Sequence, residues 1–191
     1  MCIGLVPLHN LTKGTAAGPG NRVLAAGAAT GREGIAGAAF ASAELAAETS
    51  PDIADMQPGD PQAGKMLMEA SLELVGHPDV VGIQDMGAAG LTSSSCEMAY
   101  RGGCGIQLEL SRVPTKHDGI TPVELLLSES QERMLIVVRP GGVAAVQEIF
   151  SRHGLEAADI GEVTRGKDLV LLWEGEEVGR IPAAALADGV P

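Results

Sequence analysis

The polar residues most able to bind a ligand stand at the ends of apolar segments. Asp85 ends the apolar run that begins at Val80, and a loop of small residues, 86–90, follows it. A carboxylate at the C-terminal end of a strand lies where α/β sheets usually hold ligands, and glycines let a ligand approach the backbone amides. The amides of the helix that follows also favour a nearby anion. The alternative is an ordinary strand–turn–helix corner in which Asp85 is a cap.

A second polar segment, residues 128–133, separates a short apolar helix from an apolar strand. Six consecutive polar residues there are either a solvated turn or a set of hydrogen-bonding side chains gathered where the strand begins. Gln57 stands in a loop before another predicted helix, and no turn rule requires a glutamine there. The functional interpretation predicts that Gln57, Asp85 and the 128–133 segment converge at one edge of a sheet.

Other residues are weaker candidates for ligand binding. The glycine-rich loop 27–32 lacks the G-K-[S/T] ending of a P-loop, so an ordinary tight turn is favoured over a nucleotide loop. Arg32 and Glu33 are expected to pair with each other or to line a cleft. Lys65 and Arg133 are candidates for a phosphate contact, but a surface ion pair is the better expectation for each.

Periodicity and capping signals predict the elements that must position these residues. Strands are expected at 22–29, 80–85, 106–110, 134–138, 160–164, 169–173 and 178–181, and helices at 61–75, 91–101, 123–127, 143–153 and 182–186. Two of the helices begin with an N-cap followed by proline, at Asp60-Pro61 and Thr121-Pro122. Residues 37–48 have helical composition but no clear period.

Composition limits the fold and the partners. A chain of 191 residues suits one domain or two small ones, and with 2% aromatics its core must consist of aliphatic residues and methionine. Twenty-six glycines with 45% apolar residues favour a globular α/β protein with tight loops. The net charge of −12 argues against a nucleic-acid partner, because phosphate neutralisation needs clustered Lys and Arg.

Cysteine and histidine usage bears on the compartment and on metals. The three cysteines form no C-x-x-C pair and suit a reducing compartment, and the four histidines are scattered, so a zinc site is not expected. The sequence has no basic-then-apolar leader and no run of 18 apolar residues. We therefore expect a soluble cytoplasmic protein without a membrane partner.

Four motifs give the sequence a resemblance to a known family. They are GREGIAGAAFAS (31–42), QPGDP (57–61), QDMGAAGL (84–91) and LSESQERM (127–134). Their order and spacing resemble the large synthetase subunit of phosphoribosylformylglycinamidine synthases, and the resemblance covers nearly the whole chain. One departure is Glu33, where the family typically has Asp. The carboxylate is kept, but the longer side chain changes how far it reaches from the backbone.

The resemblance implies a fold and a domain organisation. The chain is similar to the C-terminal-type domain of the aminoimidazole ribonucleotide synthetase superfamily, which is an α/β (α+β) unit of three layers, α/β/α, with a mixed sheet. Residues 22–191 would form this domain, and residues 1–21 would be a leading strand and linker from an ATP-binding lobe. That lobe and the second tandem repeat of the family are absent, and Met1 resembles an interior position, so we expect an excised domain or fragment.

The resemblance also implies a reaction. In the family, ATP activates the amide oxygen of formylglycinamide ribonucleotide (FGAR) as an iminophosphate, and glutamine-derived ammonia displaces phosphate to form formylglycinamidine ribonucleotide. Carried over to this chain, Asp85 matches a Mg²⁺ ligand, whereas Gln57, Glu129, Ser130 and Gln131 match substrate-binding residues. ATP would bind mainly through the missing lobe, which also carries the catalytic histidine loop, so the chain is expected to be inactive alone. The implied partners are a glutaminase subunit and a small accessory subunit.

Two alternatives stay open beside this ligase. The chain could be a non-catalytic assembly module of the same complex, including a homo-oligomer formed through a face that the missing lobe leaves apolar. It could also belong to another member of the superfamily, such as a selenophosphate synthetase or a thiamine-phosphate kinase relative. The 128–133 segment, which is typical of the amidine synthetases, argues against the second alternative.

Overall fold

The computed structural model describes residues 5–35 and 58–188. Its strands are β1 (Arg22–Gly27), β2 (Val80–Asp85), β3 (Gly105–Glu109), β4 (Arg133–Val138), β5 (Glu156–Thr164), β6 (Asp168–Trp173) and β7 (Glu176–Pro182). Its α-helices are α2 (Pro61–Leu74), α3 (Gly90–Gly102), α4 (Pro122–Leu127), α5 (Val143–Arg152) and α6 (Ala183–Ala187). Each strand and helix predicted on described residues is present. The largest shift is at the start of β5, at Glu156 rather than residue 160.

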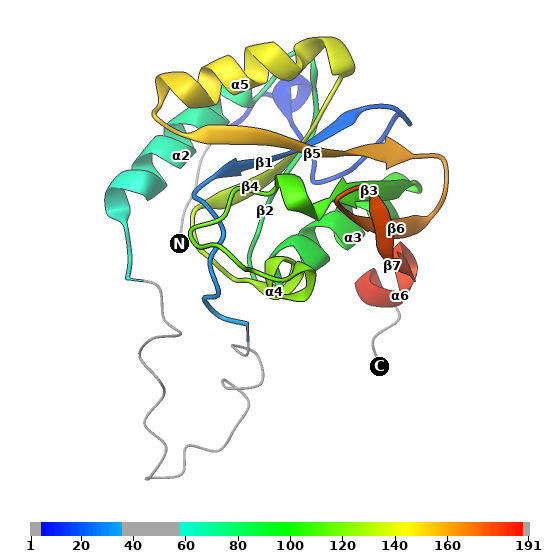
Figure 1. The fold of residues 1–191 in the computed structure, drawn as a ribbon. Helices are drawn as coiled ribbons and strands as arrows, with labels where there is room; N and C mark the ends of the chain where they lie inside the picture. The colour runs from blue at the N-terminus through cyan, green and yellow to red at the C-terminus, as the bar shows by residue number, and fades with distance from the viewer. Residues whose placement is uncertain (1–4, 36–57, 189–191) are drawn as a thin grey trace, which may run out of the picture.

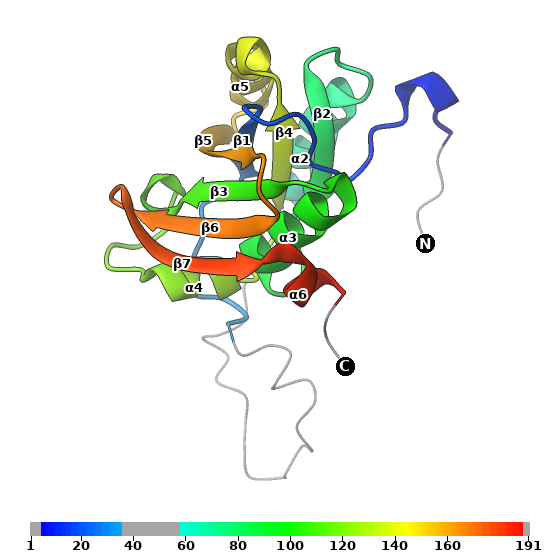
Figure 2. The same ribbon diagram turned by 90° about the vertical axis from the view of Figure 1, so that its right-hand side faces the viewer.

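Within the described residues, the strands form one mixed sheet in the order β2-β4-β1-β5-β3-β6-β7. Neighbours are antiparallel except β3 and β6, which are parallel. Helices α2 and α5 cover one face of the sheet, and α3, α4 and α6 cover the other (Figure 1). Strands β2 and β4 cross the direction of β3, β6 and β7 in Figure 2, which shows how strongly the sheet twists. The predicted three-layer α/β/α architecture is therefore confirmed.

The core has two parts because both faces of the sheet are covered. Alternate residues of β1 point to opposite faces: Val23 and Ala25 join the cluster under α3, whereas Leu24 and Ala26 join the cluster under α2 and α5. Burial on both faces explains why the central strands read as continuous apolar runs rather than as alternating patterns. In β3, the outward positions are polar, so this strand keeps the predicted alternation.

The two predicted helix starts are confirmed. The carboxylate of Asp60 accepts hydrogen bonds from the amides of Gln62 and Ala63, at 3.1 and 3.0 Å. Thr121 and Glu124 form a reciprocal capping box at the start of α4. Both signals act between residues at most three positions apart, which is why the sequence reveals them.

The N-terminal part of the chain lies against the sheet through backbone contacts. After a 3₁₀ turn at Leu8–Asn10, the carbonyl of Lys13 accepts from the amide of Ile83 at 3.1 Å, and the amide of Ala16 donates to Met98 at 2.8 Å. A Cβ at Gly102 would overlap the carbonyl of Ala16, so that approach requires glycine. A leading strand was predicted within residues 1–21; residues 5–21 contain no strand, and residues 1–4 lie outside the described residues. The helical composition noted at 37–48 also lies outside them.

The described residues include no helix with the length and hydropathy needed to cross a bilayer.

Replacing Gly102 with alanine should lower the free energy of unfolding by about 1–3 kcal/mol, because the added methyl group would displace the backbone at Ala16. Urea denaturation measures the change. Gly141→Ala is the matched control, since a Cβ there would meet nothing within 4 Å and its effect should be small. Equal stability of the two variants would show that Ala16 is not held closely against α3.

Candidate functional site

Asp85 and the polar segment 128–133 lie at the same edge of the sheet. Strand β2 ends at Asp85, which is paired in register with Met134 near the start of the antiparallel strand β4. The amide of Met86 then donates to the carbonyl of Arg133 at 3.1 Å. An antiparallel pairing places the end of one strand beside the start of its neighbour. Two of the three segments predicted to converge are therefore brought together.

The start of helix α2 reaches this edge too. A Cβ at Gly64 would lie 3.1 Å from a carboxylate oxygen of Glu132, so the first turn of α2 passes close to the 128–133 segment. Gln57, the third predicted component, lies outside the described residues. Lys65, on the same turn, forms the expected surface ion pair with Glu69 at 2.6 Å rather than facing a ligand.

Asp85 itself is exposed, and its carboxylate has no hydrogen-bond or ion-pair partner among the described residues. Helix α3 begins after Ala89, and Asp85 accepts no hydrogen bond from its first turn. The alternative interpretation, in which Asp85 was a local cap, is therefore wrong. An exposed, unpaired carboxylate at a strand end is able to bind a cation or a ligand hydroxyl group.

The carboxylate of Glu129 supplies the anion that was expected beside the N-terminus of α3. One carboxylate oxygen of Glu129 accepts from the amide of Ala89 at 3.0 Å, and the amide of Glu129 donates to the carbonyl of Glu33 at 2.8 Å. Glu129 thus joins the loop after β1 to the loop after β2. Its carboxylate satisfies one amide at the positive end of the helix.

Ser130 is buried, and its hydroxyl group is committed to the fold. It accepts from the amide of Gly31 at 2.8 Å, donates to the carboxylate of Glu33, and lies 2.9 Å from the hydroxyl of Ser128. The amide of Gly31 is occupied by this contact, which agrees with a structural turn rather than a phosphate loop. Gln131, the next residue, is exposed.

Arg133 is not the surface ion-pair residue or phosphate ligand that the sequence suggested. It is 4% exposed, and its nitrogens donate to the carbonyl of Ser130 at 2.7 Å, the carbonyl of Ser128 at 2.6 Å and the hydroxyl of Thr30 at 3.0 Å. Burial lowers the pKa of Arg133 to about 10, and the nearby carboxylate of Glu33 only partly opposes this effect. The expectation failed because an arginine at the end of a polar run resembles a surface residue.

Arg32 and Glu33 do not pair with each other. Arg32 forms an ion pair with Glu124 at 2.8 Å, and Glu33 forms one with Lys116 at 2.8 Å. Lys116 was missed by sequence reasoning, because it lies in a loop 83 residues from its partner and belongs to no motif. The Lys116 ion pair attaches the loop after β1 to the segment between β3 and α4, and the Arg32 ion pair attaches it to α4 itself.

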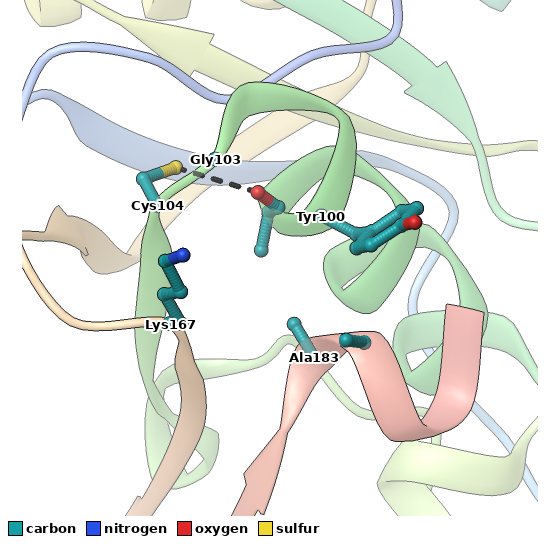
Figure 3. Close-up of a pocket in the computed structure, with 7 residues that line it drawn as sticks. Tyr100, Gly103, Cys104, Lys167 and Ala183 are labelled. Carbon is teal, nitrogen blue, oxygen red and sulfur yellow. Dashed lines mark hydrogen bonds between the residues drawn. The ribbon is translucent and has the colours of Figure 1, made fainter. Parts of the chain in front are cut away.

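A cavity of about 150 Å³ lies between α3 and α6, away from this edge (Figure 3). Tyr100, Cys104, Lys167 and Ala183 line it, and the thiol of Cys104 donates to the carbonyl of Ala99 at 3.7 Å. Burial raises the pKa of Cys104, so its thiol stays protonated at neutral pH. The cavity adjoins the C-terminal end of α3, whereas Asp85 and Glu129 lie at its N-terminal end, so it is not part of the candidate site.

Glu33 should make the candidate site sensitive to acid. Burial alone would raise the pKa of Glu33, but hydrogen bonds from Lys116 and Ser130 outweigh it and lower the pKa to about 2 from the ordinary 4.5. A lowered folded-state pKa stabilises the fold above the unfolded-state value, and that contribution disappears as the pH falls from about 4.5 towards 2. Glu33→Gln should therefore lose about 2–3 kcal/mol relative to the original chain at pH 7 and nothing near pH 2.

Urea titrations at a series of pH values measure this difference. Glu148→Gln, on the exposed face of α5, is the matched control and should change the free energy of unfolding little at any pH. A Glu33→Gln effect that does not vary with pH would contradict the lowered pKa.

Comparison with known proteins shows the family of the chain. The family model described as AIR synthase related protein, C-terminal domain, matches residues 18–174. The PurL subunit of phosphoribosylformylglycinamidine synthase from Thermoanaerobacter pseudethanolicus is 51% identical over all 191 residues, and that from Staphylococcus aureus is 50% identical. The chain spans about a quarter, 26%, of the length of each of these curated relatives.

Solved structures give the same relationship. Thermotoga maritima PurL complexed with FGAR superposes with a TM-score of 0.85 at 37% identity, covering 94% of this chain and 30% of that one. T. maritima PurL complexed with ATP gives a TM-score of 0.81 at 34% identity, covering 95% and 28%. The hydrogenase maturation protein HypE of E. coli, at 21% identity and a TM-score of 0.62 over 87% of this chain and 51% of its own, shares the fold alone.

The mixed sheet, the family match over residues 18–174 and these relatives lead to one conclusion. The chain belongs to the family of AIR synthase-related C-terminal domains, and within that family it is similar to a segment of the PurL subunit of phosphoribosylformylglycinamidine synthase.

Proposed function

We propose that this chain is the substrate- and Mg²⁺-binding domain of the ATP-dependent ligase that converts FGAR and glutamine-derived ammonia to formylglycinamidine ribonucleotide in purine biosynthesis. The observation that carries the proposal is the unpaired carboxylate of Asp85 at the same sheet edge as the 128–133 segment. T. maritima PurL, at 34–37% identity in the two superpositions, is complexed with FGAR in one solved structure and with ATP in another. A cytoplasmic location fits such a reaction.

The polar residues at the edge divide into two roles in this proposal. Gln131 is exposed and would contact the substrate directly, as would Gln57. Glu129 would present its carboxylate beside the start of α3, where one carboxylate oxygen already accepts from the amide of Ala89. Ser130, with its hydroxyl group buried, would contribute by shaping the segment rather than through that group.

Asp85 fits a Mg²⁺ ligand by its chemistry. It offers a hard, exposed oxygen ligand, and the described residues contain no group of three or more Asp, Glu, His or Cys that could hold a metal by themselves. Mg²⁺ is commonly bound by one or two carboxylates together with water and substrate phosphates. The ion would neutralise charge on the ATP phosphates during phosphoryl transfer. Asp85 would hold that ion beside the 128–133 segment.

The remaining machinery would come from outside residues 22–191. An ATP-binding lobe, joined through residues 1–21, would supply the triphosphate site and the catalytic groups, so the chain alone is expected to be inactive. Phosphoryl transfer depends on holding the triphosphate in line with its acceptor, which a single lobe cannot do. A glutaminase subunit and a small accessory subunit would deliver ammonia in the full complex.

Replacing Asp85 with asparagine should lower turnover by about 100-fold or more when the ATP-binding lobe is supplied, because an amide oxygen lacks the charge that holds Mg²⁺. Steady-state kinetics with the complemented enzyme measure turnover, and circular dichroism checks that the fold is kept. Glu148→Gln, far from the edge on α5, should leave turnover unchanged. Full turnover of the Asp85→Asn enzyme would reject the metal assignment.

One observation favours a second function, that of a non-catalytic assembly module. An open groove of about 450 Å³ runs between α2 and β2, and Met68 and Leu72 beside it are 56% and 63% exposed. Large exposed apolar surfaces commonly mark interaction sites. Light scattering combined with FGAR titration separates the two functions: a monomer that binds FGAR supports the ligase domain, whereas a stable oligomer without affinity supports assembly.

A further inference from the structure

Two residues with a left-handed backbone stand at the candidate site. Ala89 has φ 56° and Glu132 has φ 61°, and neither is a glycine. A residue with a Cβ rarely adopts this conformation, and it persists only where the surrounding contacts enforce it. The first directly precedes α3, and the second lies between Gln131 and Arg133. The contacts that enforce both conformations therefore also determine the shape of the site.

The side chain of Arg133 closes the loop that contains Glu132, the second of these residues. Its guanidinium group binds the carbonyls of Ser128 and Ser130 and the hydroxyl of Thr30, so the segment is folded around one buried group. The carbonyl of Glu132 is held in turn by the amide of Ala28 at 2.9 Å. Every acceptor of the guanidinium group is a neutral oxygen.

Burying a cation among neutral partners costs free energy and contributes little to the stability of a fold. Removing a charge from water is unfavourable, and an apolar side chain of similar size often stabilises a protein at least as well. What an apolar residue lacks is a rigid, planar set of donors that orients several acceptors at once. Arginine at position 133 therefore serves to orient these acceptors rather than to raise the stability of the fold.

The same carbonyl connects Arg133 to helix α3. A Cβ at Gly90 would overlap the carbonyl of Ser128 and would lie 3.2 Å from a guanidinium nitrogen of Arg133. The first turn of α3 is thus packed directly against the group that Arg133 binds. The carboxylate of Glu129, one residue further along, then accepts from the amide of Ala89. Movement of Arg133 would consequently shift the segment and the helix start together.

We propose that Arg133 is a positioning residue of the substrate site. It orients the 128–133 segment so that Glu129 and Gln131 face the ligand beside Asp85, and it does not touch the ligand. This inference rests on the proposed function for the identity of the ligand. Its structural part, that Arg133 holds the segment against α3, rests on the described contacts alone.

Arg133→Lys is the decisive variant, because lysine keeps the charge but concentrates its donors on one nitrogen that cannot reach three divergent acceptors. Amide hydrogen exchange, followed by NMR on the chain, should show about 10-fold or greater acceleration at Gly31, Ala89 and Glu129, whose amides lie in this network. Exchange in the central strand β1 should stay slow. Unchanged protection of the three amides would overturn the proposal.

Arg139→Lys is the matched control. Arg139 lies just beyond the other end of β4, is exposed, and donates to the carbonyl of Pro78. Its replacement should leave the amides of Gly31 and Ala89 protected. If Arg133→Lys does not fold, Thr30→Val removes one acceptor at nearly constant volume, and Thr30→Ser restores the hydroxyl group. The valine variant should accelerate exchange at the same amides, and the serine variant should not.

Calorimetric titration with FGAR tests the functional part. Arg133→Lys should bind FGAR about 10-fold more weakly than the original chain while β1 stays protected. Faster exchange with unchanged FGAR affinity would reduce Arg133 to a structural residue and overturn the positioning role. If the original chain binds no FGAR, the proposed function fails for the isolated chain, and the positioning role fails with it. The exchange data would then still decide whether Arg133 holds the segment against α3.

Discussion

A buried guanidinium group holds together the edge of the sheet on which the candidate site depends. Arg133 is the one charged side chain that is buried among the described residues, and it has no carboxylate in hydrogen-bond contact. Its three neutral acceptors belong to two different loops, the one after β1 and the one before β4. Because leaving any of these buried groups unsatisfied is unfavourable, the two loops keep one arrangement.

The layers around the sheet explain why such an arrangement is stable. Both faces are covered by helices, and the strand β1 contributes small or aliphatic side chains to each side. Phe150 is the one aromatic side chain among the buried residues that the structure describes, so packing relies on many small contacts. Polar groups lie at the ends of this sheet, where three separate segments meet around Glu33 and Ser130: the loop after β1, the segment before α4 and the 128–133 segment.

Ion pairs at the edge complete the connection between loops. Lys116 pairs with Glu33 and Arg32 pairs with Glu124, so helix α4 and the segment before it are both connected to the loop after β1. Hydrogen bonds lower the pKa of Glu33 and of Glu124 to about 2 in each case, with different donors for the two carboxylates. Asp85, by contrast, is left without a partner among the described residues, so its carboxylate is able to bind a ligand.

The sequence by itself determined the elements and their caps, since Asp60, Thr121 and the apolar runs act over a few residues. It also indicated Asp85 and the 128–133 segment, because each directly adjoins a strand. Only the tertiary structure decided which polar groups are buried: Ser130 meets Glu33 across 97 positions, and Arg133 meets Thr30 across 103. No local pattern specifies such partners, because they depend on the order of strands in the sheet.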